Sequence, residues 1–519
     1  MIVRTALLAV LLSTPSFAQS NYAWQSVGTP ALSDWATICT RIAVDPNGNA
    51  YVAYQDLTPG LGARVTVMRN VGNAWQVAGV KGGASTGAGY YCNMAFDAQG
   101  GLLVSSRDYG LGGRAGVRRY DPGTSAWSTV GGGIGPGEAH WVDLALTQDG
   151  KPCVAYADLV LGNRATAMRY DAGAWSPLGP AGFSSASAGF QKIAVASNGT
   201  IYAAYNDNSY PDAANVGKAS VRQFNPANAT WEYVGAPGFT TYGASNLTLA
   251  LDRTGTPWIA YYRYHSLIEV WRFDGTNWIK APGSPTGADV PTVDTEEWRQ
   301  WLSLQFDSQN RPYIAYQLYY QGGRAAVRRL IGNDWSLVGQ WGFTPGAADY
   351  LSMVVDAQDV PWVAYRDGVH GQRASVMRFV RVAENYCTAA TNSQGCVSPM
   401  SSTGAPSLSG ATPFVLRANS ILNNSNGVLL FGFQAAAVPF GSSFLCVGSF
   451  QRTAILNSGG TGSSPNCTGV LQYDFAAQLQ SAMPGVWIGT TLYAQYWYRD
   501  TLAASGFALT DGLRFTVGP

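Results

Sequence analysis

The residues best suited to chemistry gather in one irregular stretch of the chain, residues 263–320. This stretch mixes arginines and carboxylates with tyrosines, tryptophans and a histidine. Flat aromatic rings can lie against the faces of sugar rings, and the forked donors of arginine suit hydroxyl and carboxylate groups. The pattern predicts a carbohydrate-binding cluster that consists of Arg263, Tyr264, His265, Glu296, Glu297, Trp298, Arg299, Tyr319 and Tyr320.

Residues from other parts of the chain are expected in loops on the same face as this cluster. Tyr91 and His140 are predicted to contribute to ligand binding, and further aromatic candidates are Trp35, Tyr90, Trp141 and Tyr350. For the irregular stretch 263–320 the competing interpretation is that its loops diverge freely on an exposed surface, where their aromatic rings pack locally.

The same residue types could support β-elimination from a uronic-acid polymer. Tyr264, Tyr319 or His265 would abstract the proton, while Arg263 or Arg299 would neutralise the neighbouring carboxylate. Whether the predicted cluster is catalytic stays open at this point.

A glycoside hydrolase is the weaker enzymatic alternative. Glu296 and Glu297 are adjacent, and adjacent residues of a strand point to opposite faces, which makes them a poor acid and nucleophile pair. The sequence has no Cys-x-x-Cys or His-x-x-x-His pattern, so no metal site or cofactor is predicted. The DPNG turn at Asp45 carries oxygens that Ca²⁺ could use, but it lacks the spaced acidic run of an EF-hand loop.

A repeated unit between Trp24 and Phe379 must position these residues. Each copy has three short apolar segments with Asn/Asp/Gly turns, followed by a tryptophan, which is typical of four-stranded antiparallel units. The tryptophans recur at intervals of 47–57 residues, at Trp24, Trp75, Trp127, Trp175, Trp231, Trp278 and Trp335. The sequence therefore predicts an all-β fold with a seven-bladed β-propeller. Because the last unit stops without a fourth strand, the Trp24 segment is expected to complete the last blade and close the ring.

Acidic and cationic residues recur at fixed positions of five units. Aspartates end the second segment, at Asp56, Asp108, Asp158, Asp207 and Asp367. Cations open the third segment, at Arg64, Arg114, Arg164, Lys218 and Arg373. Catalysis needs a residue once, so this repetition predicts a structural role, with each pair meeting across its hairpin.

The rest of the chain indicates export and a second domain. Residues 1–18 have the pattern of a secretory signal peptide, residues 19–382 form the predicted propeller, 383–410 a linker or domain entry, and 411–519 a β-sandwich. The net charge is +1, without a basic stripe, so nucleic acid is not an expected partner. No other apolar run is long enough for a membrane span. A secreted or cell-surface protein with an extracellular polysaccharide or glycan as partner is expected.

Seven cysteines in an exported chain favour disulfides. Short loops make Cys387–Cys396 and Cys446–Cys467 the preferred pairs, although four cysteines allow other connectivities. The remaining three, Cys39, Cys92 and Cys153, fall in three different units and are expected to be buried free thiols rather than bridged.

Two resemblances accompany these arguments. The repeats, with YVAYQD at Tyr51 and their V-x-R and tryptophan segments, resemble those of secreted bacterial propellers that are loosely related to sialidase-type and kelch-type repeats. This resemblance covers about residues 24–380 and implies a fold rather than an activity. Residues 385–519, with CTAATNSQGC at Cys387 and AQYWYRD at Ala494, resemble a C-terminal domain of large exported proteins from environmental bacteria, which implies secretion or surface display.

Three functions follow as hypotheses. The first is binding of an extracellular polymer, carbohydrate above all, through loops of the fifth and sixth blades. The second is degradation of a polysaccharide, with a lyase ahead of a hydrolase. The third is a cell-surface scaffold for protein interactions. Seven-bladed polysaccharide lyases are a known family type, but no motif in this chain matches them residue by residue.

Overall fold

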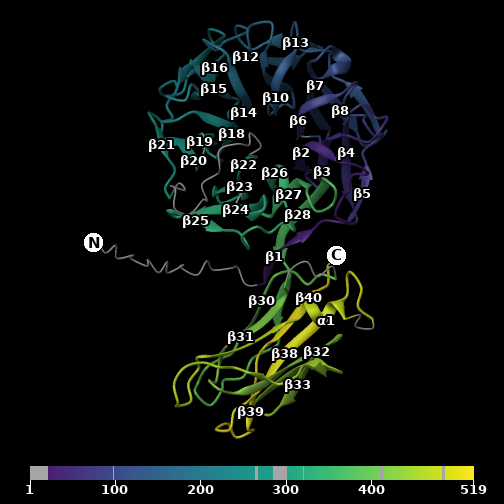
Figure 1. Ribbon diagram of the computed structural model, residues 1–519, viewed down its shortest axis with the longest axis vertical. Coiled ribbons are helices and arrows are strands. Elements are labelled where there is room, and N and C mark those ends of the chain that lie inside the picture. Colours follow the sequence, from purple (N-terminus) through teal and green to yellow (C-terminus); the bar gives the residue numbers. More distant parts are fainter. Residues whose placement is uncertain are drawn as a thin grey trace, which may run out of the picture.

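This computed structural model describes residues 21–97, 99–263, 267–283, 301–318, 321–408, 413–481 and 485–518. The regular secondary structure of the described residues is almost entirely β, as predicted. Figure 1 shows four-stranded sheets arranged in a ring, with a second group of strands attached beneath the sheet that contains β26, β27 and β28.

Each sheet of the ring is a blade, and within the described residues the blades number seven. Blade one contains β2 (Thr37–Val44), β3 (Ala50–Asp56), β4 (Val65–Val71) and β5 (Ala74–Val77). Blade two contains β6 (Gly89–Phe96), β7 (Leu102–Asp108), β8 (Arg114–Asp121) and β9 (Ala126–Thr129). Blade three contains β10 (Ala139–Leu146), β11 (Pro152–Asp158), β12 (Arg164–Asp171) and β13 (Ala174–Pro177). A 3-10 turn, η1 (Tyr109–Leu111), follows β7.

Blade four contains β14 (Ala188–Val195), β15 (Ile201–Pro211), β16 (Gly217–Asn225) and β17 (Thr230–Tyr233). Blade five contains β18 (Ala244–Leu251), β19 (Pro257–Arg263), β20 (Leu267–Phe273) and β21 (Trp278–Lys280). Blade six contains β22 (Leu302–Phe306), β23 (Pro312–Leu318), β24 (Arg324–Ile331) and β25 (Asp334–Leu337). Blade seven contains β26 (Ala348–Val355), β27 (Pro361–Asp367), β28 (Arg373–Arg381) and β1 (Tyr22–Ser26).

The first strand of the described chain completes the last blade. β1 pairs antiparallel with β28, and Trp24 lies opposite Phe379, as the offset of the repeats predicted. Blades one and seven also share a hydrophobic cluster, in which Val52 and Tyr54 pack with Val376. Chain segments more than 300 residues apart are therefore neighbours at this point.

The second strand of a blade is buried on both faces, because a neighbouring blade covers each face. Every residue of β3 and of β11 is buried. This is the reason why the YVAY-like segments are almost continuously apolar instead of alternating with polar residues. The outermost strand is more exposed, as in β5 and β13.

The repeated tryptophans link neighbouring blades through hydrogen bonds. In six of them the indole nitrogen donates to a backbone carbonyl of the preceding blade over 2.7–2.9 Å, in the pairs Trp24–Val338, Trp75–Val27, Trp127–Ala78, Trp175–Val130, Trp231–Leu178 and Trp278–Val234. The indole nitrogen of Trp335 is buried without a hydrogen-bond partner among the described residues.

A glycine follows each accepting carbonyl and makes room for the indole. These glycines, Gly28, Gly79, Gly131, Gly179, Gly235 and Gly339, have φ of 64–80°. A Cβ on Gly131 would lie 2.8 Å from a ring carbon of Trp175. Glycine is therefore required twice, for its left-handed backbone and for the close approach. The tryptophan and Val-Gly elements of the repeat are the two halves of one contact between blades.

The C-terminal domain is a β-sandwich. One sheet joins β29 (Ala383–Tyr386), β40 (Gly512–Thr516), β38 (Thr491–Arg499), β32 (Asn426–Gly432), β35 (Gln451–Arg452), β36 (Leu456–Asn457) and β39 (Phe507–Leu509). The others join β30 (Met400–Thr403), β31 (Val415–Ile421) and β37 (Gly469–Asp474), and β33 (Gln434–Phe440) with β34 (Ser443–Gly448); α1 spans Ala476–Gln480. Leu416 of β31 and Tyr496 of β38 belong to one buried cluster, so the two larger sheets share a core. Residues expected to form a linker contribute β29 and β30.

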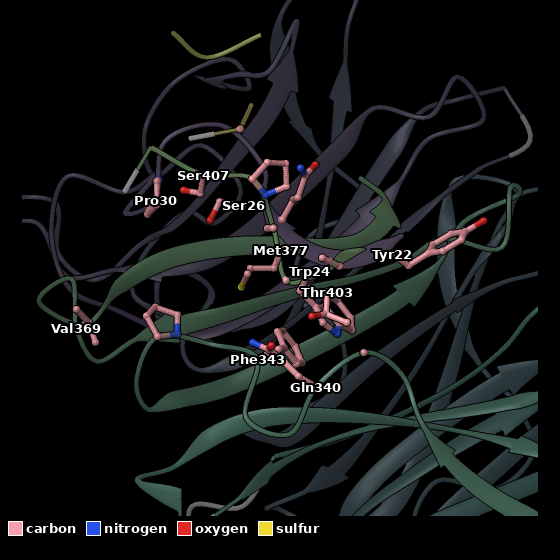
Figure 2. Close-up of a pocket in the computed structure, with 18 of the residues that line it drawn as sticks. Tyr22, Trp24, Ser26, Pro30, Gln340, Phe343, Val369, Met377, Thr403 and Ser407 are labelled. Carbon is pink, nitrogen blue, oxygen red and sulfur yellow. The ribbon is translucent and has the colours of Figure 1, made fainter. Parts of the chain in front are cut away.

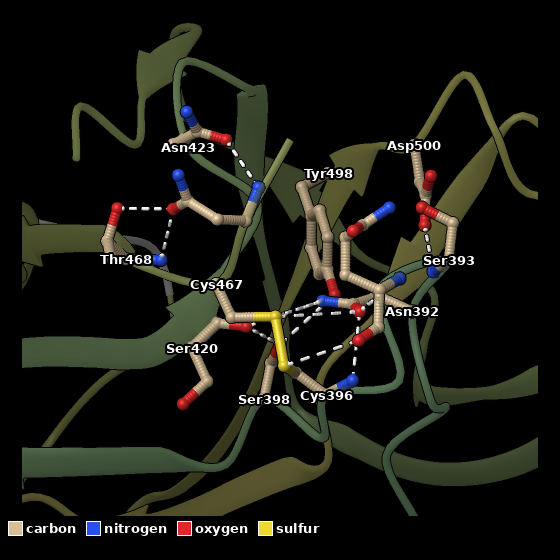
Figure 3. The surroundings of a disulfide bond; sticks show 12 residues. Asn392, Ser393, Cys396, Ser398, Ser420, Asn423, Cys467, Thr468, Tyr498 and Asp500 are labelled. Carbon is tan, nitrogen blue, oxygen red and sulfur yellow. Dashed lines mark hydrogen bonds between the residues drawn. A yellow bond between two sulfur atoms is a disulfide. The ribbon is translucent and has the colours of Figure 1, made fainter. Parts of the chain in front are cut away.

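The preferred disulfide pairing was wrong. The bonds are Cys387–Cys446 and Cys396–Cys467, with Cα–Cα distances of 6.1 and 6.5 Å. Cys387 and Cys396 flank a turn in which Asn392 accepts from the backbone nitrogen of Cys396 through its side chain, and this turn carries Cys396 to Cys467 (Figure 3). Tertiary packing, rather than loop length, selects the partners.

The two domains meet along β1. The backbone nitrogen of Asn21 donates to the carbonyl of Ser402, and its side-chain amide donates to Asn385 over 2.8 Å. Beside this contact lies a largely apolar pocket of about 280 Å³ (Figure 2). Its lining includes Trp24, Phe343 and, from the sandwich side, Thr403. Among the described residues, no helix has the length and apolar composition to cross a membrane.

The contact between glycine and indole predicts a specific loss of stability. We expect Gly131→Ala to lower the free energy of unfolding by about 2–4 kcal/mol, because it adds a clash with Trp175 to the cost of a left-handed alanine. Gly173→Ala is the matched control, since Gly173 has φ of 87° but open space around it, and it should cost about 1 kcal/mol. Denaturant titration measures both. Equal losses would show that the close approach contributes nothing.

Because both disulfides lie in the sandwich, removal of one of them should destabilise that domain and not the propeller. We expect the double variant Cys396→Ser/Cys467→Ser to lose about 4 kcal/mol from the unfolding transition of the sandwich, because the bond closes a long loop in the unfolded chain. Its sequence separation is 71 residues. Calorimetry should show the sandwich transition at a lower temperature. A fall of the propeller transition by the same amount would contradict this localised role.

Candidate functional site

Most residues of the predicted cluster lie outside the described residues: Tyr264, His265, Glu296, Glu297, Trp298, Arg299, Tyr319 and Tyr320. Arg263 is described. It ends β19 opposite Ala244, and its guanidinium lies 3.5 Å from the ring centre of Tyr242. Among the residues of the predicted cluster, the structure thus describes Arg263 alone.

The register confirms that two sets of loops open at one end of the blades. The first residue of the inner strand pairs with the end of the second strand, as in Ala139 with Asp158 and Ala244 with Arg263. Tyr91 and His140 lie near this end in β6 and β10. We call it the upper face.

Every inner strand that is described from its start has a β-bulge close to the upper face. The register slips by one position in β2, β6, β10, β14, β18 and β26. The first unpaired residue is left-handed in each case, with φ of 48–60°, at Cys39, Tyr91, Trp141, Phe190, Asn246 and Tyr350. Trp301 has the equivalent position before β22, two residues ahead of Ser303, as Tyr350 is two residues ahead of Ser352.

A left-handed conformation is unfavourable for a bulky side chain, so its repetition needs a cause in the fold. A bulge turns the strand and redirects the side chain at that point. Figure 1 shows β2, β6, β10, β14, β18, β22 and β26 nearest to the centre of the ring. The six bulges, together with Trp301 in blade six, thus place one half-buried residue of each blade around the centre of the upper face.

Aromatic rings occupy the bulge positions of blades two, three and four. Trp141 lies 6.3 Å from Tyr91 and 5.7 Å from Phe190 between ring centres, and it meets the ring of His140 edge-on at 5.5 Å. We call Tyr91, His140, Trp141 and Phe190 the aromatic arc. All four residues are half-buried, so each is partly open to solvent.

Charged groups stand next to the aromatic arc. Arg107 forms an ion pair with Glu138, and its guanidinium lies 4.9 Å from the ring centre of Tyr109. Burial, together with the nearby Arg107 cation, lowers the pKa of His140, while Glu138 opposes this shift. Burial raises the pKa of Tyr91. The arc therefore carries a neutral imidazole and a neutral phenol beside a guanidinium at neutral pH.

A second aromatic pair lies across the ring. Trp301 and Tyr350 stack with centres 4.2 Å apart. Arg366 donates to the carboxylate of Asp349 over 2.6 Å and lies 5.1 Å from the ring centre of Tyr350. Gln317 donates to the same carboxylate. Aromatic faces and fixed polar groups thus recur at a second place on the upper face.

A buried carboxylate fixes the strands beneath the arc. Asp143 accepts hydrogen bonds from the side chain of Asn93 in blade two, and from Lys192 and the backbone of Ile193 in blade four. It therefore holds three inner strands in one arrangement.

Four of the five repeated aspartates lie opposite the predicted cations in the hairpin register, and Asp56 bonds to Arg64 through the backbone, but the carboxylates bind other partners. Each accepts from a backbone nitrogen two residues further on, as Asp56 does from Thr58 and Asp158 from Val160. Among the described ion pairs, none joins them to the cations of the third strands. Asp367 instead contacts the imidazole of His370 over 2.8 Å. The aspartates close the loop after the second strand because an Asx turn satisfies backbone donors locally.

Tyr91 and His140 were predicted from the sequence, but Phe190 was not. The sequence does contain a pattern that marks Phe190. When the inner strands are aligned on the three residues that end them, such as Ile42–Val44, one column contains Cys39, Tyr91, Trp141, Phe190, Asn246, Trp301 and Tyr350. Five of these seven residues are aromatic. Among the described residues, no group of three or more His, Cys, Asp or Glu side chains is placed to hold a metal ion.

No protein-family model matches the sequence, and no curated protein matches it either. Several solved structures share its general arrangement of strands. The extracellular domain of a hybrid two-component system from B. thetaiotaomicron has a TM-score of 0.45 at 11% identity, over 76% of this chain and 45% of that one, so the match spans less than half of that structure.

Two more matches cover nearly all of the matched structure. A lectin from Burkholderia pseudomallei has a TM-score of 0.47 at 13% identity, over 66% of this chain and 95% of that chain. An α-L-arabinanase from Penicillium chrysogenum, complexed with arabinobiose, has a TM-score of 0.39 at 14% identity, over 69% and 97%. At these identities and TM-scores the similarities identify neither a shared site nor a shared activity.

The charges beside the arc predict a titration. We expect Arg107→Met to raise the pKa of His140, because the substitution removes a repelling cation and leaves Glu138 to stabilise the imidazolium. Arg119→Met is the control, since Arg119 pairs with Asp97 at the opposite end of blade two. NMR titration of the imidazole measures both. A lower pKa in Arg107→Met would contradict the arrangement.

Proposed function

We propose that this protein is exported and binds an extracellular carbohydrate polymer at the upper face of the propeller. The observation that carries the proposal is the aromatic arc, where Tyr91, Trp141 and Phe190 stand at equivalent bulge positions of adjacent blades. Binding sites for small ligands combine aromatic walls with a few fixed polar groups. The ion pair of Arg107 and Glu138 supplies such groups beside the arc.

The spacing of the arc favours a polymer over a single sugar. Its rings come from three consecutive blades, and the stack of Trp301 and Tyr350 adds a second aromatic place on the same face. A chain of sugars can contact several rings at once. After the first sugar has bound, the linked sugars are held at a high effective concentration near the other rings, which raises the overall affinity. The predicted residues of blades five and six would extend this surface, with Arg263 and His265 among them.

Export is supported by two features of the chain. The first residues have the composition of a secretory signal, and the C-terminal domain contains two disulfides, which persist in oxidising compartments. An extracellular polymer fits this location.

A lyase is the second candidate, and one observation favours it. Tyr91, His140 and Arg107 are the residue types that β-elimination from a uronate polymer requires, and the lowered pKa of His140 keeps its imidazole neutral and able to accept a proton. Incubation with uronate polymers, followed through the ultraviolet absorbance of the unsaturated product, tests this candidate.

The binding proposal predicts the effect of removing one ring. Once a screen of polysaccharides has identified a ligand, we expect Trp141→Ala to weaken binding about 30-fold, because loss of a central aromatic contact costs about 2 kcal/mol. Trp487→Ala is the matched control, since Trp487 lies in the sandwich and is 64% exposed, and its affinity should not change. Calorimetric titration measures both.

Two outcomes would contradict the proposal. The first is an unchanged affinity in a Trp141→Ala variant that unfolds at the wild-type temperature. The second is binding only to proteins, with no polysaccharide bound, which would favour the scaffold hypothesis.

A further inference from the structure

Two of the three free cysteines lie against each other at the centre of the propeller. Cys39 is the bulge residue of β2 and Cys92 follows the bulge residue of β6, so they belong to the inner strands of blades one and two. Cys39 is half-buried and Cys92 is fully buried. The third free thiol, Cys153, is buried in β11 of blade three.

Each sulfur contacts the backbone of the other residue. The backbone nitrogen of Cys92 donates to the Sγ of Cys39 over 3.0 Å, and the Sγ of Cys92 lies 2.5 Å from the carbonyl oxygen of Cys39. Because a sulfur lies only one bond beyond Cβ, reciprocal contacts of this kind bring the two sulfurs within reach of each other by side-chain rotation.

The position of blade one that is equivalent to Cys92 shows what a purely structural residue would do there. Thr40, which follows the bulge residue of blade one, donates its hydroxyl to the carbonyl oxygen of Tyr350 in blade seven. Cys92 makes the corresponding contact to Cys39, so a hydroxyl would satisfy this position. The fold therefore does not require the sulfur of Cys92, and its meeting with Cys39 is a feature of these two blades.

The surroundings favour a thiolate on Cys39. The contact with Cys92 lowers its pKa to about 6, and the cations Arg41 and Lys192 act in the same direction against the effect of burial. Burial and the neighbouring Cys39 raise the pKa of the Cys92 thiol. Burial raises the pKa of Cys153 to about 12. The thiolate is the reactive form of cysteine, so the three thiols should differ sharply in reactivity.

We propose that Cys39 and Cys92 form a reactive dithiol site that exchanges with low-molecular-weight disulfides to give a bond between the inner strands of blades one and two. The Cys39 thiolate attacks one sulfur of the small disulfide and releases a small thiolate, leaving a mixed disulfide on Cys39. The Cys92 thiol loses its proton and displaces the second small thiolate. Two protein thiols are oxidised and one small disulfide is reduced to two thiols. This proposal is independent of carbohydrate binding.

The test uses the full chain and oxidised glutathione as the probe. After mild reduction and removal of the reductant, we expect the wild-type protein to lose two thiols together, and peptide mapping to link the peptide that ends at Arg41 to the peptide that ends at Arg107. Cys153 serves as an internal comparison and should stay free. The Cys92→Ser variant should stop at a mixed disulfide with glutathione on Cys39, and the Cys39→Ser variant should not react.

The pH dependence gives a second, independent readout. Alkylation of Cys39 by iodoacetamide in the native wild-type protein should reach half its maximal rate near pH 6, because the thiolate forms there, whereas Cys153 should not react across the range. The wild-type measurements alone decide the matter if a serine variant does not fold. Equal reactivity of Cys39 and Cys153, or a glutathione adduct that persists on wild-type Cys39, would overturn the proposal.

Discussion

The hydrogen bond from an indole nitrogen to a carbonyl of the preceding blade is the interaction on which the ring depends. It recurs at six of the junctions between blades, always beside a left-handed glycine whose missing Cβ lets the indole approach. A buried carbonyl without a donor would cost about 1–3 kcal/mol, so each bond constrains the spacing of the two sheets that it joins. With the outer strands spaced in this way, the inner strands crowd together at the centre.

The β-bulges follow from that crowding. Strands that converge on one axis must bend, and a bulge bends a strand while it frees one residue from pairing. The freed residues differ in type from blade to blade, from Cys39 and Asn246 to Trp141. The framework is thus repeated, whereas the residues presented at the centre of the upper face are individual to each blade.

The repeats made the fold predictable because the same contact between blades recurs at a nearly constant spacing along the sequence. Trp24, displaced to the start of the chain, revealed which strand completes the last blade, and the register confirms it. The pairing of Cys387 with Cys446 was not predictable, since it depends on how distant strands of the sandwich pack. The side-chain partners of the repeated aspartates were also missed, because an aspartate can form either an Asx turn or an ion pair and the sequence does not distinguish the two.

The candidate site was only partly visible in the sequence. Tyr91 and His140 could be selected although they lie in strands β6 and β10 and not in loops, but Phe190 looks like an ordinary core residue until the bulge is known. Its exposure depends on a left-handed backbone that no propensity of phenylalanine predicts. The residues of blades five and six were selected because they break the repeat, and most of them lie outside the described residues.

The junction between the domains has a mechanical consequence. β28 runs directly into the sandwich, while β1, its antiparallel partner, begins at the residue next to Asn21, which binds the sandwich. If the sandwich were anchored and a polymer pulled on the propeller, the tension would run along β28. The five residue pairs between β28 and β1 would then be sheared together instead of being peeled apart one at a time. The joint that completes the ring is therefore also oriented to resist being drawn apart.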